Sequence, residues 1–105
     1  MRILSVNIGN TQIAFNNCMW SGKEYIYLNG QVVSKEFSWF GMDHVFEVEE
    51  NEGWVEYIVT TRFGWKGITA DLRRNGMYLI KDGGSGTHIN FPAPSITPYI
   101  ASELV

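Results

Sequence analysis

Two Asn-Gly pairs, each flanked by alternating apolar residues, constrain the fold of this chain more than any other feature. Asn29-Gly30 separates residues 24–28 from residues 31–34, and Asn75-Gly76 separates residues 68–74 from residues 77–80. Asn and Gly tolerate the positive φ angles of a type I′ turn, whose twist suits two paired antiparallel strands. Each pair therefore predicts a tight β-hairpin.

Short alternating runs continue the same pattern up to residue 82. They predict further strands around residues 4–8, 13–16, 44–49 and 54–61. The strand over residues 25–28 carries large side chains on both faces, which indicates a central position in a sheet. No window shows the 3.6-residue period of an amphipathic helix, and turns recur at the spacing of a β-sandwich. The sequence predicts an all-β fold, an antiparallel β-sandwich of about seven to nine strands.

The composition changes at residue 83. Gly83-Gly84-Ser85-Gly86 is typical of a flexible linker, and the three prolines that follow cannot donate to a central ladder. We expect residues 1–82 to form the β-sandwich domain and residues 83–105 to form a Gly/Pro-containing tail. Its apolar residues, Ile89 and Phe91 among them, indicate that this tail docks on another surface.

Charge and composition argue against several classes of protein. The chain has 105 residues and a net charge of −3, and its eight Lys and Arg are scattered, so no basic stripe indicates nucleic acid as a partner. Its start lacks the features of a signal peptide, and no apolar run is long enough to cross a bilayer. Cys18, a lone cysteine, cannot form an intramolecular disulfide. We therefore expect a cytoplasmic protein without a transmembrane segment.

Residues that could carry catalysis or bind a metal are few. Cys18, His44 and His88 lie in different local contexts, so they do not indicate a nucleophilic triad, and they are too few for structural zinc. We expect Cys18 to be a small buried hydrophobe, His44 a solvated histidine at a strand end, and His88 an exposed residue. An acidic cluster lacks the spacing of a calcium loop and is expected to be a solvated strand face and turn: Glu47, Glu49, Glu50 and Glu52. The sequence predicts no enzyme, no cofactor and no metal.

Two irregular connections place aromatic residues where a partner could reach them. Residues 62–67 combine two aromatic rings with two cations, and residues 39–40 are both aromatic. Exposed aromatic residues beside cations are typical of recognition surfaces, although such rings can also fold back over the end of a sandwich. The predicted partner-binding residues are Trp39, Phe40, Arg62, Phe63, Trp65 and Lys66.

The leading hypothesis is a non-enzymatic interaction module that binds a protein partner or a second copy of itself. Sheet edges, the aromatic turns or the C-terminal tail would make the contact, for example by adding a strand to an unpaired edge. The alternative hypothesis is a domain that binds a small ligand or carbohydrate on exposed aromatic rings. The candidate platform for such a ligand consists of Trp20, Tyr25, Tyr27, Trp54 and Tyr57.

Several elements of residues 21–82 follow one another in a characteristic order. They are Ser21-Gly22-Lys23 before an aromatic strand, Tyr27-Leu28-Asn29-Gly30, Lys35-Glu36-Phe37, a strand around Phe46, and Leu72-Arg73-Arg74-Asn75-Gly76-Met77. This order resembles the Fas apoptotic inhibitory molecule family and its bacterial relatives. The resemblance implies an all-β sandwich that works by binding partners, with no active-site motif to carry over. Residues 1–20 and the residues after Asp82 are not covered by it.

Overall fold

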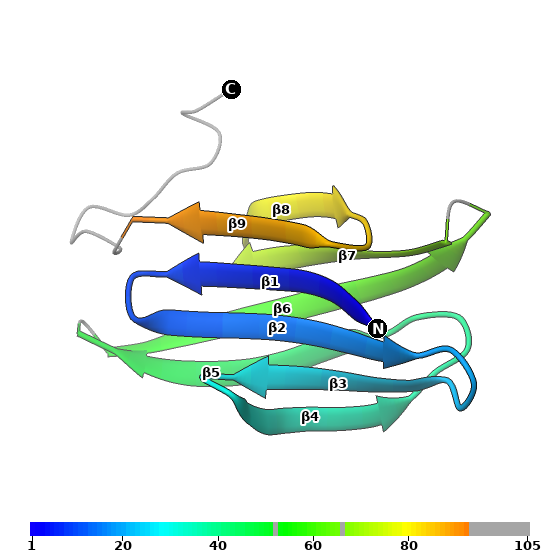
Figure 1. Cartoon of the computed structure of the whole chain (residues 1–105). Coiled ribbons are helices and arrows are strands. Elements are labelled where there is room, and N and C mark those ends of the chain that lie inside the picture. Colours follow the sequence, from blue (N-terminus) through cyan, green and yellow to red (C-terminus); the bar gives the residue numbers. More distant parts are fainter. Residues whose placement is uncertain (52, 66, 93–105) are drawn as a thin grey trace.

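Two β-sheets packed face to face make up the part of the chain that the structure describes (Figure 1). The structure is a computed structural model, and it describes residues 1–51, 53–65 and 67–92. The described strands are β1 (Arg2–Ile8), β2 (Thr11–Cys18), β3 (Lys23–Leu28), β4 (Gln31–Phe37), β5 (Asp43–Glu50), β6 (Gly53–Gly64), β7 (Gly67–Arg74), β8 (Met77–Gly83) and β9 (Thr87–Phe91).

The first sheet, sheet A, has the strand order β4-β3-β2-β1-β9, and the second, sheet B, has the order β5-β6-β7-β8. Neighbouring strands are antiparallel except β1 and β9, which are parallel. β3 lies between β2 and β4, as the large side chains on both of its faces predict. The predicted β-sandwich is confirmed. Among the described residues the structure contains no helix capable of spanning a membrane.

Both Asn-Gly hairpins form where the sequence predicts them. The φ angles are 49° at Asn29, 84° at Gly30, 47° at Asn75 and 82° at Gly76, all in the left-handed region. Each asparagine also ties its hairpin to the adjacent strand. Asn29 Oδ1 accepts a hydrogen bond of 2.7 Å from the Gln12 N–H, and Asn75 Oδ1 accepts one of 2.9 Å from the Glu56 N–H.

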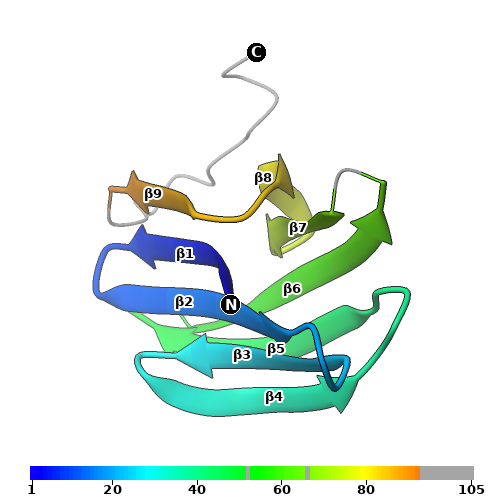
Figure 2. The same ribbon diagram turned by 45° about the vertical axis from the view of Figure 1, so that its right-hand side comes forward.

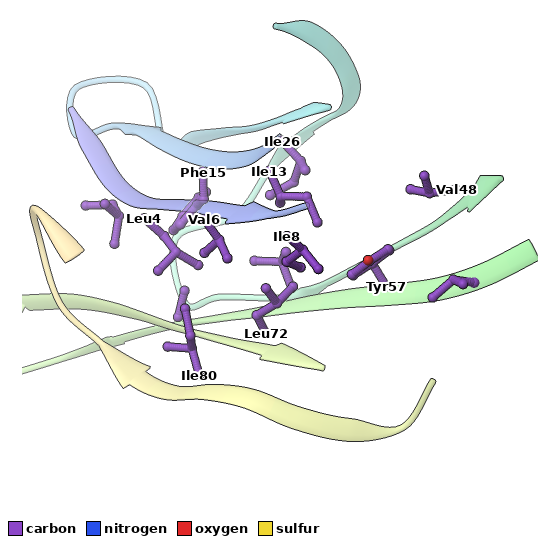
Figure 3. Packing of buried hydrophobic residues seen from close by; sticks show 14 of the residues in the cluster. Leu4, Val6, Ile8, Ile13, Phe15, Ile26, Val48, Tyr57, Leu72 and Ile80 are labelled. Carbon is purple, nitrogen blue, oxygen red and sulfur yellow. The ribbon is translucent and has the colours of Figure 1, made fainter. Parts of the chain in front are cut away.

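The core lies between the inner faces of the two sheets (Figure 3). Every second residue of a strand points inward, so sheet A contributes Val6 and Phe15, while sheet B contributes Tyr57 and Leu72, all four fully buried. Burial and a hydrogen bond to Glu50 raise the pKa of the Tyr57 hydroxyl, so it stays neutral. That hydroxyl donates to Glu50, which also pairs with Arg74 and closes one side of the core with polar contacts.

The segment expected to be a tail contributes the ninth strand. β9 pairs with β1 in parallel, and Asn7 Nδ2 donates a hydrogen bond of 2.8 Å to Asn90 Oδ1 across the pair. Ile89 and Phe91 pack against the core, as their apolar character indicates, while His88 is exposed as expected. Residues 87–91 therefore dock as a strand of the chain's own sheet. Residues 93–105 of the predicted tail lie outside the described residues.

The turns divide between two opposite ends of the sandwich. The connections β2–β3, β4–β5 and β6–β7 lie on the right in Figure 1, and in the rotated view of Figure 2 the β6–β7 connection lies above the other two. The turns β1–β2, β3–β4, β5–β6 and β7–β8, which include both Asn-Gly turns, lie at the other end. Connections that are far apart in the sequence are thus brought to one end of the fold.

Candidate functional site

Large apolar side chains are exposed on the connections that share one end of the sandwich. Trp20 in the β2–β3 turn is 95% exposed, Phe40 in the β4–β5 connection is 88% exposed, and Trp65 after β6 is 94% exposed. A monomeric protein rarely leaves so large an apolar surface in water unless the surface binds something. We call this surface the aromatic end and define it by Met19, Trp20, Phe37, Trp39, Phe40, Phe63 and Trp65, all of them exposed.

Close packing around a glycine holds two of these rings in place. The Phe37 and Trp39 rings meet edge to face with their centroids 5.4 Å apart. A Cβ atom on Gly22 would lie 3.1 Å from each ring, and the φ of +71° at this position also favours glycine. The Gly22 carbonyl accepts a hydrogen bond of 2.8 Å from the Ser38 N–H. The β2–β3 turn and the β4–β5 connection are therefore packed together.

The β4–β5 connection is also pressed against the end of β6. A Cβ atom on Gly41 would lie only 2.1 Å from the Thr61 carbonyl oxygen, so the two backbones touch. The Thr61 N–H donates to the Met42 carbonyl at 2.8 Å, and the Met42 N–H donates to Thr61 Oγ1 at 3.0 Å. These contacts fix the connection that carries Trp39 and Phe40.

The structure places five of the six predicted partner-binding residues at this end. Trp39 is 51% exposed and Phe63 is 59% exposed, so their rings do not fold back into the core. Arg62 is half-exposed and is held by Asp71 at 2.5 Å and Asp82 at 3.3 Å. Lys66 lies outside the described residues. Binding of a partner by these residues stays a prediction.

The ion pair of Arg62 and Asp71 is partly buried. The hydrogen bond to Asp71 is the main reason that the pKa of the Arg62 guanidinium is raised. Burial of Asp71 acts to raise the pKa of its carboxyl, but hydrogen bonds from Arg62 and the Asp82 N–H outweigh it, so the pKa of Asp71 is lowered. Both groups are charged at neutral pH.

A second polar group lies inside the sandwich, and it corrects the expectation for His44. This residue is 1% exposed, so it is not a solvated histidine at a strand end. Its Nε2 lies 2.9 Å from Glu24 Oε1, and its Nδ1 lies 2.7 Å from Ser34 Oγ. Thr61 Oγ1 donates to the same Glu24 oxygen at 2.6 Å. The four side chains come from β3, β4, β5 and β6 and join the two sheets.

Sequence reasoning missed this polar group, although part of the signal was present. The two-residue period places Glu24 on the same face as Ile26 and Leu28, and it places His44 on the same face as Phe46 and Val48. Two polar residues on two apolar faces indicate partners inside the core. Their pairing with each other is set by the stacking of the sheets, which the local pattern does not contain.

Cys18 also differs from the expectation. It lies at the end of β2 and is half-buried, not buried in the core. Hydrogen bonds from the Ser21 side chain and backbone lower the pKa of the Cys18 thiol. In the acidic cluster, Glu47 and Glu49 are exposed as expected, Glu50 pairs with Arg74 at 2.6 Å, and Glu52 lies outside the described residues.

The aromatic residues of the candidate ligand platform are not brought together. Tyr57 is fully buried in the core, and Trp20 and Trp54 are exposed at opposite ends of the sandwich. Tyr25 and Tyr27 stack with their ring centroids 6.4 Å apart. A hollow of about 240 Å³ lies beside Tyr27, and its other lining residues are Arg2, Gln12, Ala14, Asn16 and Gly30.

No model of a protein family, no curated protein and no solved structure matches this chain. The resemblance to the Fas apoptotic inhibitory molecule family therefore stays a prediction.

Proposed function

We propose that this chain is a homotypic interaction module, in which two copies bind each other through their aromatic ends. The observation that carries the proposal is the near-complete exposure of Trp20, Phe40 and Trp65 on three connections at one end of the sandwich. Aromatic residues and Arg are the side chains most enriched at the energetic centres of protein interfaces. The proposal involves no chemical step.

The size of the aromatic end fits a specific interface. A fully covered aromatic side chain buries about 150–250 Å². The seven exposed residues, three nearly fully exposed and four about half exposed, thus offer on the order of 1,000 Å². A stable interface of ordinary size needs about 800 Å² from each partner. One copy therefore presents enough apolar surface for a second copy.

The distribution of charge also favours a second copy. Glu47 and Glu56 face each other across β5 and β6, and Glu49 lies opposite Trp54, close to the β5–β6 turn. This turn lies at the end of the sandwich opposite the aromatic end (Figure 1). Contact between two aromatic ends keeps these acidic groups of the two copies apart, so their mutual repulsion is small.

The aromatic end is held in its binding shape before contact. The rings of Phe37 and Trp39 pack against Gly22, and Gly41 allows the β4–β5 connection to pack directly against the backbone of β6. A surface that is already ordered loses less conformational entropy on binding than a flexible one. The rigid connections therefore strengthen association without adding contacts.

Sedimentation velocity of the full chain over a dilution series tests this proposal. We expect the wild-type chain to form a dimer that dissociates on dilution, and the triple variant Trp20→Ser, Phe40→Ser, Trp65→Ser to be monomeric. The control is Trp54→Ser, which removes an exposed tryptophan at the opposite end and should leave the dimer intact.

Two outcomes would overturn the proposal. One is a wild-type chain that is monomeric at every concentration, including a monomer whose aromatic end binds neutral lipid vesicles instead. The other is a dimer that persists in the triple variant, which would assign the contact to another surface such as a sheet edge. Near-UV circular dichroism shows whether each variant keeps its fold.

A further inference from the structure

A serine, a histidine and a glutamate from three different strands form a continuous hydrogen-bonded row inside the sandwich. Ser34 Oγ of β4 lies 2.7 Å from His44 Nδ1 of β5, and His44 Nε2 lies 2.9 Å from Glu24 Oε1 of β3. The His44 side chain is completely buried, and that of Glu24 is 4% exposed. A nucleophile bonded to a base, which is oriented by a third group, is the arrangement that activates a hydroxyl.

The hydrogen bonds assign a role to each nitrogen of His44. Glu24 Oε1 accepts from Thr61 Oγ1 at 2.6 Å and faces His44 Nε2, so the carboxylate acts as the acceptor for both donors. Nε2–H therefore donates to this carboxylate. The lone pair is left on Nδ1, which faces the Ser34 hydroxyl. Glu24 thus orients the base, and Thr61 holds Glu24.

Ser34 is the least buried of the three residues. β4 is an edge strand of sheet A, and Ser34 is half-buried while Glu24 and His44 are buried. The register of β3 and β4 shifts beside this residue, because Ile26 pairs with Ser34 but Tyr27 pairs with Val32, which leaves Val33 as an extra residue. Bulges of this kind re-aim a side chain and are common beside active sites.

The position of Ser34 in an edge strand indicates the kind of reaction. An edge strand carries backbone N–H groups that point away from its sheet, and such groups are common donors to an oxyanion. An oxyanion forms when a hydroxyl attacks the carbonyl carbon of an ester.

We propose that Ser34 is a nucleophile that accepts the acyl group of a carboxylic ester. Ser34 Oγ attacks the carbonyl carbon and its proton passes to His44 Nδ1. The bond between the carbonyl carbon and the alkoxy oxygen then breaks, and the proton passes from Nδ1 to the leaving alcohol. The products are an ester on Ser34 and a free alcohol, with no net oxidation or reduction. This site is independent of the aromatic end.

A fluorophosphonate probe tests the proposal, because it phosphonylates activated serines with loss of fluoride. We expect intact-mass spectrometry to show one added group on the folded wild-type chain, peptide mapping to place it on Ser34, and Ser34→Ala to abolish it. The matched control is Ser5→Ala, since Ser5 is another half-buried strand serine whose hydroxyl has no imidazole bonded to it in the described residues. The control should be labelled like the wild type.

His44→Gln tests the role of the base separately. A positioned general base typically contributes about 10²- to 10⁴-fold to a rate, so labelling should slow by at least about 100-fold in this variant. Circular dichroism establishes whether the variant is folded. If the variant is unfolded, the release of p-nitrophenol from p-nitrophenyl acetate by the wild type and by Ser34→Ala gives a second measurement. We expect the wild type to release an initial burst of p-nitrophenol and Ser34→Ala to release none. Absence of labelling on folded wild-type protein, or labelling that Ser34→Ala retains, would overturn the proposal.

Discussion

Replacing Thr61 with valine is expected to destabilise the fold through the polar group between the sheets. Valine has nearly the shape of threonine, so the change removes the hydroxyl without opening a cavity. The hydroxyl donates to Glu24 Oε1 at 2.6 Å and accepts from the Met42 N–H at 3.0 Å, and Thr61 is only 3% exposed. Both contacts are lost together.

The size of the effect follows from these contacts. A hydrogen bond to a charged group contributes about 2 kcal/mol, and leaving the Met42 N–H without its partner costs about 1 kcal/mol more. The buried methyl group that replaces the hydroxyl restores about 0.8 kcal/mol. We expect Thr61→Val to lower the free energy of unfolding by about 2 kcal/mol. For a domain of this size, that corresponds to a fall in Tm of about 10 °C.

Urea unfolding followed by tryptophan fluorescence measures this difference. Thr60→Val is the matched control, because Thr60 is the neighbouring residue of β6 and lies on the opposite face. Its hydroxyl donates to Asp43 in an exposed contact and accepts a hydrogen bond of 3.1 Å from Arg73. We expect the control to lose less than about 1 kcal/mol, as is usual for exposed polar contacts. Equal losses in the two variants, with equal denaturant slopes, would refute the idea that the buried group joins the sheets.

Three further predictions concern the core, a glycine and an ion pair. Leu72→Ala should lower the free energy of unfolding by about 2–5 kcal/mol in the same assay, since Leu72 is fully buried. Gly41→Ala should lower the free energy of unfolding by more than about 3 kcal/mol, because the added Cβ would collide with the Thr61 carbonyl. Gly30→Ala should lower it by only about 1 kcal/mol, because its Cβ would meet nothing within 4 Å and only the positive φ is unfavourable. Chemical denaturation of the two variants measures the difference. Burial acts to raise the pKa of the Asp71 carboxyl, but the hydrogen bonds from Arg62 and the Asp82 N–H outweigh burial, so the folded pKa is lowered. The ionised Asp71 therefore stabilises the fold above about pH 4, and this stabilisation is lost as the pH falls through the folded pKa. Arg62→Met should therefore shift acid unfolding, followed by circular dichroism, to higher pH, and an unchanged midpoint would contradict this assignment.

The sequence predicts those parts of the fold that depend on neighbouring residues. Asn29-Gly30 and Asn75-Gly76 specify their hairpins because a type I′ turn is encoded by the two residues at its corner. The strands over residues 44–49 and 54–61 follow from alternation over a few positions. Thr87–Phe91 alternates as well, but it lies between a glycine-rich run and Pro92, so composition indicated a tail. Its pairing with β1 depends on residues far away in the sequence.

The candidate sites depend on contacts between distant segments, and the sequence predicts them only in part. The sequence predicts Trp39 and Phe40, and also Phe63 and Trp65, as partner-binding residues. Their position at a common end follows from the alternation of turns between the two ends of the sandwich. The contact of His44 with Ser34 crosses from one sheet to the other. No short sequence pattern encodes a contact between residues of two different sheets.

The parallel pairing of β9 with β1 has a consequence for the order of folding. Asn7 and Asn90, which meet across this pair, are 83 positions apart, so sheet A is complete only after all of sheet B has been synthesised. Contacts of such long sequence separation form late and slow the folding of small domains. Until then β1 is an unprotected edge, and its Leu4, Val6 and Ile8 are among the most buried residues of the finished protein. The nascent chain is therefore most prone to aggregation in the interval before its ninth strand docks.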